Sequence, residues 1–146
     1  MEAIKAARLD PQAILPSRKH PTDAGMDFYV LTAAVVGAHQ SAILRTGVTI
    51  SIPVGLVGLL KPKSRSEHLV GAGVVDAGYQ GEILIKVFNP LGRALTFSAG
   101  EAIAQMLLIP VFTPAVCEAD PLEIHAQAST RGASGGIVDQ QRGNRG

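Results

Sequence analysis

The sequence predicts an all-β domain of the sandwich or jelly-roll type, and three observations favour this fold class. Sixteen Gly and nine Pro are spread along the 146 residues and divide the chain into short segments. Residues 82–88 alternate between the two faces of a strand. One face carries Ile83, Ile85 and Val87, and the other carries Leu84, Lys86 and Phe88. Short apolar runs recur about every ten residues, a spacing typical of β-sandwiches and jelly rolls.

Each expected strand is a short apolar run that ends at a turn signal. The runs cover residues 4–9, 26–31, 42–45, 48–52, 56–61, 82–88 and 102–112, and a further strand starts at Thr96-Phe97. Asp10-Pro11 closes the first run, and Pro110 interrupts the last one. No stretch longer than about ten residues shows a 3.6-residue period, so we expect at most a short helix after Ser66.

Composition favours one domain followed by a tail. Hydrophobic residues make up 47% of the chain, which is enough to bury a core of its own. After Ser129 the hydrophobic pattern is lost and Gly, Gln and Arg become frequent. We therefore expect residues 1–128 to form the β domain and residues 129–146 to form a mobile tail in the free monomer.

Charge and targeting signals argue against several classes of function. The formal net charge is +1, from 13 basic and 12 acidic residues, which gives no reason to expect a nucleic-acid partner. No apolar run approaches the ~20 residues that cross a bilayer, so no membrane partner is expected. The first residues lack the apolar core of a signal peptide, and the single cysteine, Cys117, cannot form a disulfide within the chain. These features predict a cytoplasmic protein.

Two segments carry the most informative chemistry. Residues 73–82, Gly-Val-Val-Asp-Ala-Gly-Tyr-Gln-Gly-Glu, form a glycine-punctuated turn that leads into the alternating strand. Such a hairpin can present backbone amides near Gly73 and Val75 to a flat ligand, while Asp76 offers the carboxylate that a general base needs. Residues 63–66, Lys-Ser-Arg-Ser, combine a planar guanidinium with hydroxyl donors, and this combination suits polyphosphate oxygens.

These segments resemble motifs of the trimeric dUTPases, which split dUTP into dUMP and pyrophosphate. Residues 24–28 are similar to that family's Ala-Gly-x-Asp-Leu, residues 99–105 to its Pro-Gly-Glu-x-Ile-Ala-Gln, and residues 130–137 to its glycine-rich tail. With residues 63–66 and 73–82, the segments lie in the family's order. Residues 24–28 form the first motif, 63–66 the second, 73–82 the third, 99–105 the fourth and 130–137 the fifth. The resemblance implies a jelly-roll-like domain that assembles as a homotrimer, with active sites at the subunit boundaries.

The resemblance also implies a role for each matching residue. Asp76 would activate the water that attacks the α-phosphorus, and Arg65, Ser66 and Gln105 would stabilise the departing pyrophosphate. Asp27 would hold Mg²⁺ through the water shell of the metal. The substrate-binding candidates are Lys63, Ser64, Gly73, Val75, Tyr79, Lys86, Arg131, Gly135, Gly136 and Ile137. Among them, the tyrosine would pack under the deoxyribose and leave no room for a 2′-hydroxyl.

The tail departs from the family pattern. One residue is inserted, and Ile137 stands where the family has a phenylalanine that stacks on the uracil. Loss of aromatic stacking weakens binding by about 1–3 kcal/mol per base, so we expect a weaker lid over the site.

Two alternatives compete with dUTP hydrolysis. The related dCTP deaminases carry a catalytic glutamate on the strand after the hairpin, where this chain has Lys86, so deamination is disfavoured. A non-catalytic nucleotide-sensing or protein-binding module on the same fold is supported by the divergent tail. Turnover of dUTP would discriminate this module from an enzyme.

Overall fold

The computed structural model describes residues 2–71 and 73–125 of the chain. The chain divides into two compact units, of which the first ends at Thr113 and the second starts at Pro114. The strands of the first unit are β1 (Lys5–Arg8), β2 (Gly25–Tyr29), β3 (Ala34–Val36), β4 (Ser41–Arg45), β5 (Val48–Ser51), β6 (Leu56–Lys61), β7 (Leu69–Gly71), β8 (Val74–Val75), β9 (Leu84–Phe88), β10 (Leu95–Phe97) and β11 (Ala102–Pro110). In the described part of the second unit, α1 (Pro121–Ile124) is one short helix.

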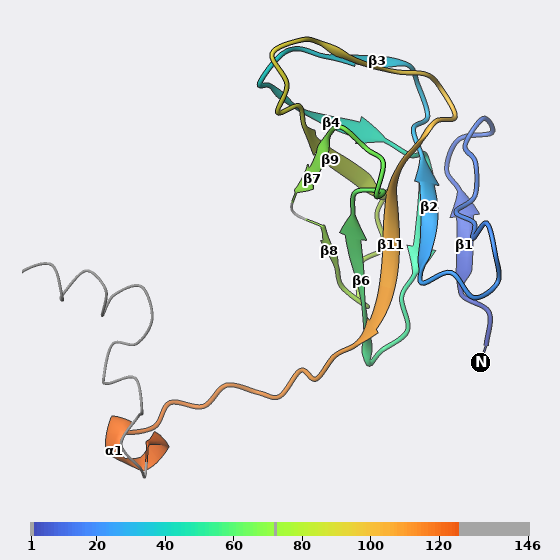
Figure 1. Ribbon diagram of the computed structural model, residues 1–146. Helices are drawn as coiled ribbons and strands as arrows, with labels where there is room; N and C mark the ends of the chain where they lie inside the picture. Colours follow the sequence, from blue (N-terminus) through green and yellow to red (C-terminus); the bar gives the residue numbers. More distant parts are fainter. Residues whose placement is uncertain (1, 72, 126–146) are drawn as a thin grey trace, which may run out of the picture. The chain divides into compact units, whose positions relative to one another are not determined.

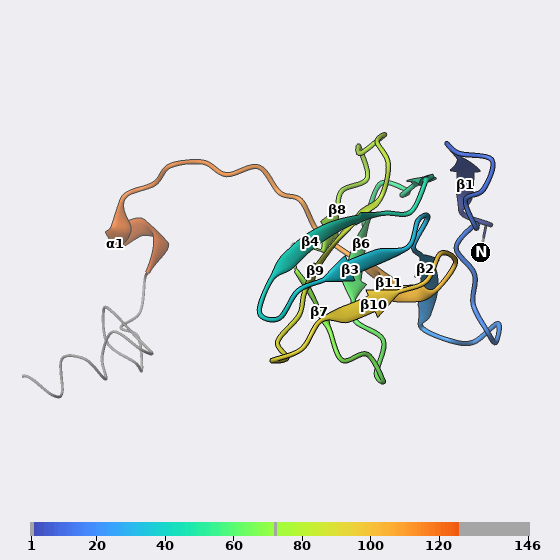
Figure 2. The ribbon, with the colours of Figure 1, turned by 90° about the horizontal axis from the view of Figure 1, so that it is seen from above.

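The strands pair in antiparallel fashion within four sheets. The largest has the order β2-β11-β6-β8, and a second has the order β4-β9-β7. Figure 1 shows β11 between β2 and β6, with β8 on the far side of β6. β1 pairs with β5, and β3 pairs with β10, which lie side by side in the view from above (Figure 2). β11 therefore lies between β2 and β6, both of which come much earlier in the sequence.

One hydrophobic core collects side chains from all of these sheets, which makes the fold an all-β sandwich. The predicted alternation of residues 82–88 is confirmed: Ile83, Ile85 and Val87 are buried, while the side chains between them face outward. β11 buries Ile103 and Met106 in the same core. Because β2 alternates likewise, with Met26 and Phe28 buried, its remaining side chains lie on the opposite face of the sheet.

The strand predictions are confirmed for the long runs and incomplete for the short ones. β3, β7 and β8 were not predicted separately, because two or three residues are too few to show an alternating pattern. Residues 67–68 form a bend that leads into β7, so the described residues directly after Ser66 form no helix. The helix α1 was not predicted, although Asp120 caps it and Pro121 starts it, in agreement with the usual preferences at a helix N-terminus.

No helix among the described residues is long and apolar enough to cross a membrane.

Candidate active site

Polar side chains form a row across the four-stranded sheet. Gln105 on β11 lies opposite Asp27 on β2 and, on its other side, opposite Lys61 at the end of β6. Because paired residues on adjacent strands point to the same face, this register gathers three polar side chains on one face of the sheet. The first and fourth motifs therefore meet here, beside the end of β6 that leads into the second motif.

Lys63 reaches back over this row and binds the aspartate. Its ammonium donates to both carboxylate oxygens of Asp27, at 2.6 and 2.7 Å. The side chain of Asp27 is only 16% exposed, and that of Lys63 is 37% exposed. The ion pair is thus partly shielded from water, which strengthens the attraction between the two charges.

The turn after Lys63 places the other members of the second motif. The backbone N–H of Ser66 donates to the carbonyl of Lys63 at 2.9 Å, so residues 63–66 form a tight turn. Ser64 and Arg65 at the centre of this turn are exposed. The structure therefore brings Lys63, rather than Arg65, into contact with Asp27.

Gln105 is fixed by its neighbours. Its Nε2 donates to the carbonyl of Pro62 at 3.1 Å. Its side chain also lies directly over Gly25, where any Cβ would overlap with the amide oxygen. A side chain at position 25 would therefore displace Gln105 from this arrangement.

A cavity of about 290 Å³ adjoins this row of side chains. Its polar lining consists of Lys63, Arg65, Ser66, Glu67, His68, Thr96 and Glu101. The buried ring of His68 contacts the carbonyl of Ile103 through Nε2 at 2.7 Å and packs edge-on against Phe97, with ring centroids 5.0 Å apart. Sequence reasoning missed His68, because one histidine outside any motif carries no signal of its own.

The hairpin of the third motif forms a separate cavity of about 220 Å³, lined by Val74, Val75, Asp76, Tyr79 and Leu84. Asp76, the predicted base, and Tyr79, the predicted sugar contact, thus line the same cavity. The backbone N–H of Tyr79 donates to the carbonyl of Asp76 at 3.1 Å, which closes the turn between them. Both side chains are exposed.

Gly73 joins this hairpin to β6. Its carbonyl accepts a hydrogen bond of 2.7 Å from the backbone N–H of Leu60, and a Cβ at this position would overlap with the Leu60 carbonyl. One of the two lone pairs of the Gly73 carbonyl is therefore already used in the sheet.

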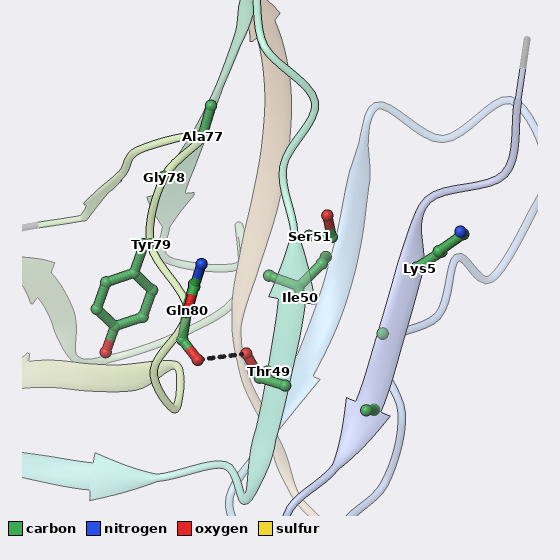
Figure 3. A pocket seen from close by; sticks show the side chains of 10 residues that line it. Lys5, Thr49, Ile50, Ser51, Ala77, Gly78, Tyr79 and Gln80 are labelled. Atoms are coloured by element: carbon green, nitrogen blue, oxygen red, sulfur yellow. Dashed lines mark hydrogen bonds between the residues drawn. The ribbon is translucent and has the colours of Figure 1, made fainter.

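The tip of the hairpin borders a third cavity, of about 320 Å³, on the side of β5 (Figure 3). Figure 3 shows Gln80 beside Thr49, whose hydroxyl donates to the Gln80 carbonyl at 3.3 Å. The ring of Tyr79 lies on the other side of the hairpin from Lys5 of β1.

Within one chain the two halves of the candidate site lie apart. Val75 pairs with Gly58 of β6, whereas Gln105 pairs with Lys61, three residues farther along the same strand. The two pairing positions are therefore about 10 Å apart, and the chain continues from Val75 to Asp76 in the direction away from Lys61. Lys86 lies on β9, which belongs to the other large sheet.

Four predicted residues lie outside the described part of the chain: Arg131, Gly135, Gly136 and Ile137. The boundary expected between residues 128 and 129 lies there as well, so it stays a prediction. The described residues include no group of three or more His, Cys, Asp or Glu side chains arranged to hold a metal ion. A metal ion bound by the described residues would therefore have few carboxylate ligands, such as that of Asp27, and would need further ligands from a bound substrate.

Comparison with known proteins identifies the family. The dUTPase family model matches residues 11–136. The deoxyuridine 5′-triphosphate nucleotidohydrolase of Mycolicibacterium gilvum is 37% identical over 141 residues, which cover 92% of each chain. The enzyme of the same name from Mycobacterium leprae is 37% identical over 142 residues, again 92% of each chain.

Solved structures agree with the sequence relatives. The dUTPase of Staphylococcus bacteriophage 80alpha, determined with dUpNHpp, superposes with a TM-score of 0.80 at 27% identity, covering 92% of this chain and 96% of that one. A mutant dUTPase from phage phi11 of S. aureus, described for its structural Mg(II) ion, gives a TM-score of 0.77 at 25% identity over 84% of this chain and 99% of that one. On the agreement of sequence, fold and motif order, this chain belongs to the dUTPase family.

Proposed function

We propose that this protein hydrolyses dUTP to dUMP and pyrophosphate, which keeps uracil out of DNA and supplies dUMP for thymidylate synthesis. The observation that carries the proposal is the cavity of the hairpin, where Asp76 and Tyr79 lie together. Family membership supports the same reaction, because relatives that align with this chain over 92% of their length are named for it. Retention of Asp76 argues against a pure nucleotide sensor, since a sensor needs no group that activates water.

In the proposed mechanism the carboxylate of Asp76 orients a water and accepts its proton as the water attacks the α-phosphorus. Arg65, Ser66 and Gln105 donate hydrogen bonds to the departing pyrophosphate, where negative charge develops. Lys63, which lines the same cavity as Arg65 and Ser66, adds a further positive charge for the phosphates. Fixing the triphosphate in one conformation is itself a large part of the acceleration.

The donor set around Asp27 is compatible with Mg²⁺. Mg²⁺ keeps several of its waters and needs few protein carboxylates when a substrate supplies phosphate oxygens. A carboxylate has about four lone-pair sites, so Asp27 can accept from Lys63 and still accept from a metal-bound water. When bound, the ion would neutralise charge on the triphosphate.

The separation of the two halves within one chain supports a homotrimer. A neighbouring copy would bring its hairpin with Asp76 against the row that contains Asp27 and Gln105. The chain also has apolar surface that another copy could cover. On the outer face of the β4-β9-β7 sheet the exposed apolar side chains are Ile43, Leu69, Leu84 and Phe88. Because large exposed apolar patches are typical of interaction surfaces, this face is where we expect another copy to pack.

Pyrophosphate release tests the proposed function. Release would be measured from dUTP, with dCTP, dTTP and UTP in parallel, each with and without Mg²⁺. We expect rapid, Mg²⁺-dependent release from dUTP alone. Tight dUTP binding by calorimetry without release would contradict the proposal and would favour the nucleotide-sensing module.

A further inference from the structure

We propose that the ion pair between Arg45 and Glu82 positions Tyr79 and thereby sets the discrimination of this site between deoxyribonucleotides and ribonucleotides. The inference rests on the proposed function, because it concerns the sugar-binding residue of that site. It adds two positioning residues, neither of which belongs to the predicted catalytic or substrate-binding set.

Glu82 contacts both the tyrosine and the arginine. Its backbone carbonyl accepts a hydrogen bond of 2.6 Å from the hydroxyl of Tyr79. Its carboxylate accepts two hydrogen bonds from Arg45, from Nε at 3.1 Å and from Nη2 at 2.9 Å. The guanidinium therefore holds with two parallel bonds the same residue that anchors the tyrosine hydroxyl, and such bidentate pairs fix geometry as well as charge.

The tyrosine ring has little room to move while this anchor holds. A Cβ on Gly81 would lie 2.6 Å from the tyrosine hydroxyl, which shows that the ring lies directly over the glycine. Tyr79 is nevertheless 43% exposed, and it lines the cavity beside Asp76. A ring that must exclude a 2′-hydroxyl by steric contact has to resist displacement, and its hydroxyl contact supplies that resistance.

Further contacts attach the same stretch of chain to the segment that follows Arg45. Thr46 donates through its hydroxyl to the carbonyl of Ile83 at 2.6 Å, and the backbone N–H of Ile83 donates to the carbonyl of Val48 at 2.8 Å. These two contacts are buried and hold the base of the hairpin. The ion pair at Glu82 lies one residue closer to Tyr79 than these contacts at Ile83. It therefore fixes the segment between Tyr79 and Glu82, which the buried contacts do not reach.

The two partners of the ion pair differ in exposure. The side chain of Glu82 is 16% exposed and that of Arg45 is 57% exposed. The hydrogen bond and the charge of Glu82 raise the pKa of Arg45 above its ordinary value. Loss of Arg45 would leave a largely buried carboxylate without its partner, which disturbs the hairpin more than the neutral Glu82→Gln change does.

Kinetics and binding on four proteins test the proposal: the wild type, Arg45→Gln, Glu82→Gln and the double variant. We expect the KM for dUTP to rise about tenfold in Arg45→Gln, below the ~100-fold that a 1 Å misplacement can cause, while kcat stays nearly constant. The preference for dUTP over UTP should fall by a similar factor. The double variant should lose less than the sum of the single effects, because the two residues act as one unit.

A signal from the tyrosine ring tests positioning without turnover. The chain has two tyrosines, so ¹³C labelling at the ζ carbon alone gives one ring signal for each, which a Tyr29→Phe variant would assign. We expect the Tyr79 signal to shift or broaden in Arg45→Gln and Glu82→Gln, while the Tyr29 signal stays unchanged. Gly81→Ala, which displaces the ring directly, should show the same combination of changes.

Arg93→Gln is the matched control, because Arg93 also forms an ion pair, with Glu67, at an exposed position. It should leave both the ring signal and the sugar preference unchanged. An unaltered Tyr79 signal and unaltered dUTP preference in Arg45→Gln would overturn the inference. If the wild type releases no pyrophosphate, the proposed function fails, but the ring signal and the ratio of dUTP to UTP affinities still decide the role of the ion pair.

Discussion

The two aspartates of the candidate site have different surroundings. Asp27 is largely buried and accepts both of its contacts from Lys63, so its charge is already balanced by a neighbour. Asp76 is exposed at the rim of the hairpin cavity. A carboxylate that must exchange a proton with water benefits from such access, whereas a carboxylate that organises cations benefits from a fixed position.

Asp76→Asn should therefore bind dUTP and turn it over at least ~100-fold more slowly, because the amide cannot accept the proton of the attacking water. Single-turnover kinetics together with calorimetric dUTP affinity would measure the two properties separately. Near-normal turnover would remove Asp76 from the mechanism.

Asp23 gives a prediction about pH. The backbone N–H of His20 donates to its carboxylate at 3.0 Å, and this bond lowers the pKa of Asp23 below its ordinary value of 3.8. Because the folded-state pKa is depressed, the resulting stability is present above the ordinary value and is lost as the pH falls through the lower one. Asp23→Asn should therefore show a weaker loss of stability in this acid range than the wild type. Urea unfolding midpoints measured between neutral and acid pH would show the difference, and parallel curves would contradict it.

At the level of elements, the sequence predicted the strands that are long enough to show an alternating pattern. It missed the shortest strands and the contacts between residues that are distant in the sequence. The alternation in β9 identified both its buried face and its exposed face, because successive side chains of a strand point to opposite faces of the sheet. The two-residue strand β8 has no such pattern, and it is defined by its pairing with Gly58 and Leu59 of β6. The contact of Lys63 with Asp27 spans 36 residues and follows from the register of β2, β11 and β6, which sequence alone does not define.

Gly73→Ala should weaken the junction of β6 and β8, because the added Cβ overlaps with backbone rather than with a flexible side chain. We expect a loss of about 1–3 kcal/mol in the free energy of unfolding, typical of overpacking. Denaturant unfolding would measure it. Gly71→Ala is the control, since a Cβ at Gly71 meets nothing within 4 Å, and an equal loss in both variants would contradict the explanation.

At the level of the whole molecule, a single chain has a complete core and a divided site. The core draws on strands from β2 to β11 and lies within the unit that ends at Thr113. The hairpin and the row around Asp27 are directed to different ends of β6. One chain therefore buries a core of its own, while the proposed activity depends on several copies.

Deletion of residues 129–146 should leave a folded protein with reduced activity, since the core formed by the described residues lies before the deletion. We expect a loss of about tenfold or more in kcat/KM, because a charge-assisted hydrogen bond such as that proposed for Arg131 contributes about 1.5–3 kcal/mol. Steady-state kinetics and thermal unfolding of the truncated protein would test both parts. Full activity after truncation would show that the divergent tail has no role in catalysis.

The central position of β11 also determines the order in which the protein can fold during synthesis. β2 ends at Tyr29, but its partner β11 starts at Ala102, so the ribosome adds roughly 70 residues before the pairing is possible, which takes about 4–15 s at typical rates. Through this interval the edge of β2 that faces β11 lacks that partner, and the corresponding edge of β6 lacks it from Lys61 onward. Nascent chains with unpaired strand edges are prone to associate with one another. The unpaired edges are therefore covered only when β11, close to the end of the β unit, has been made.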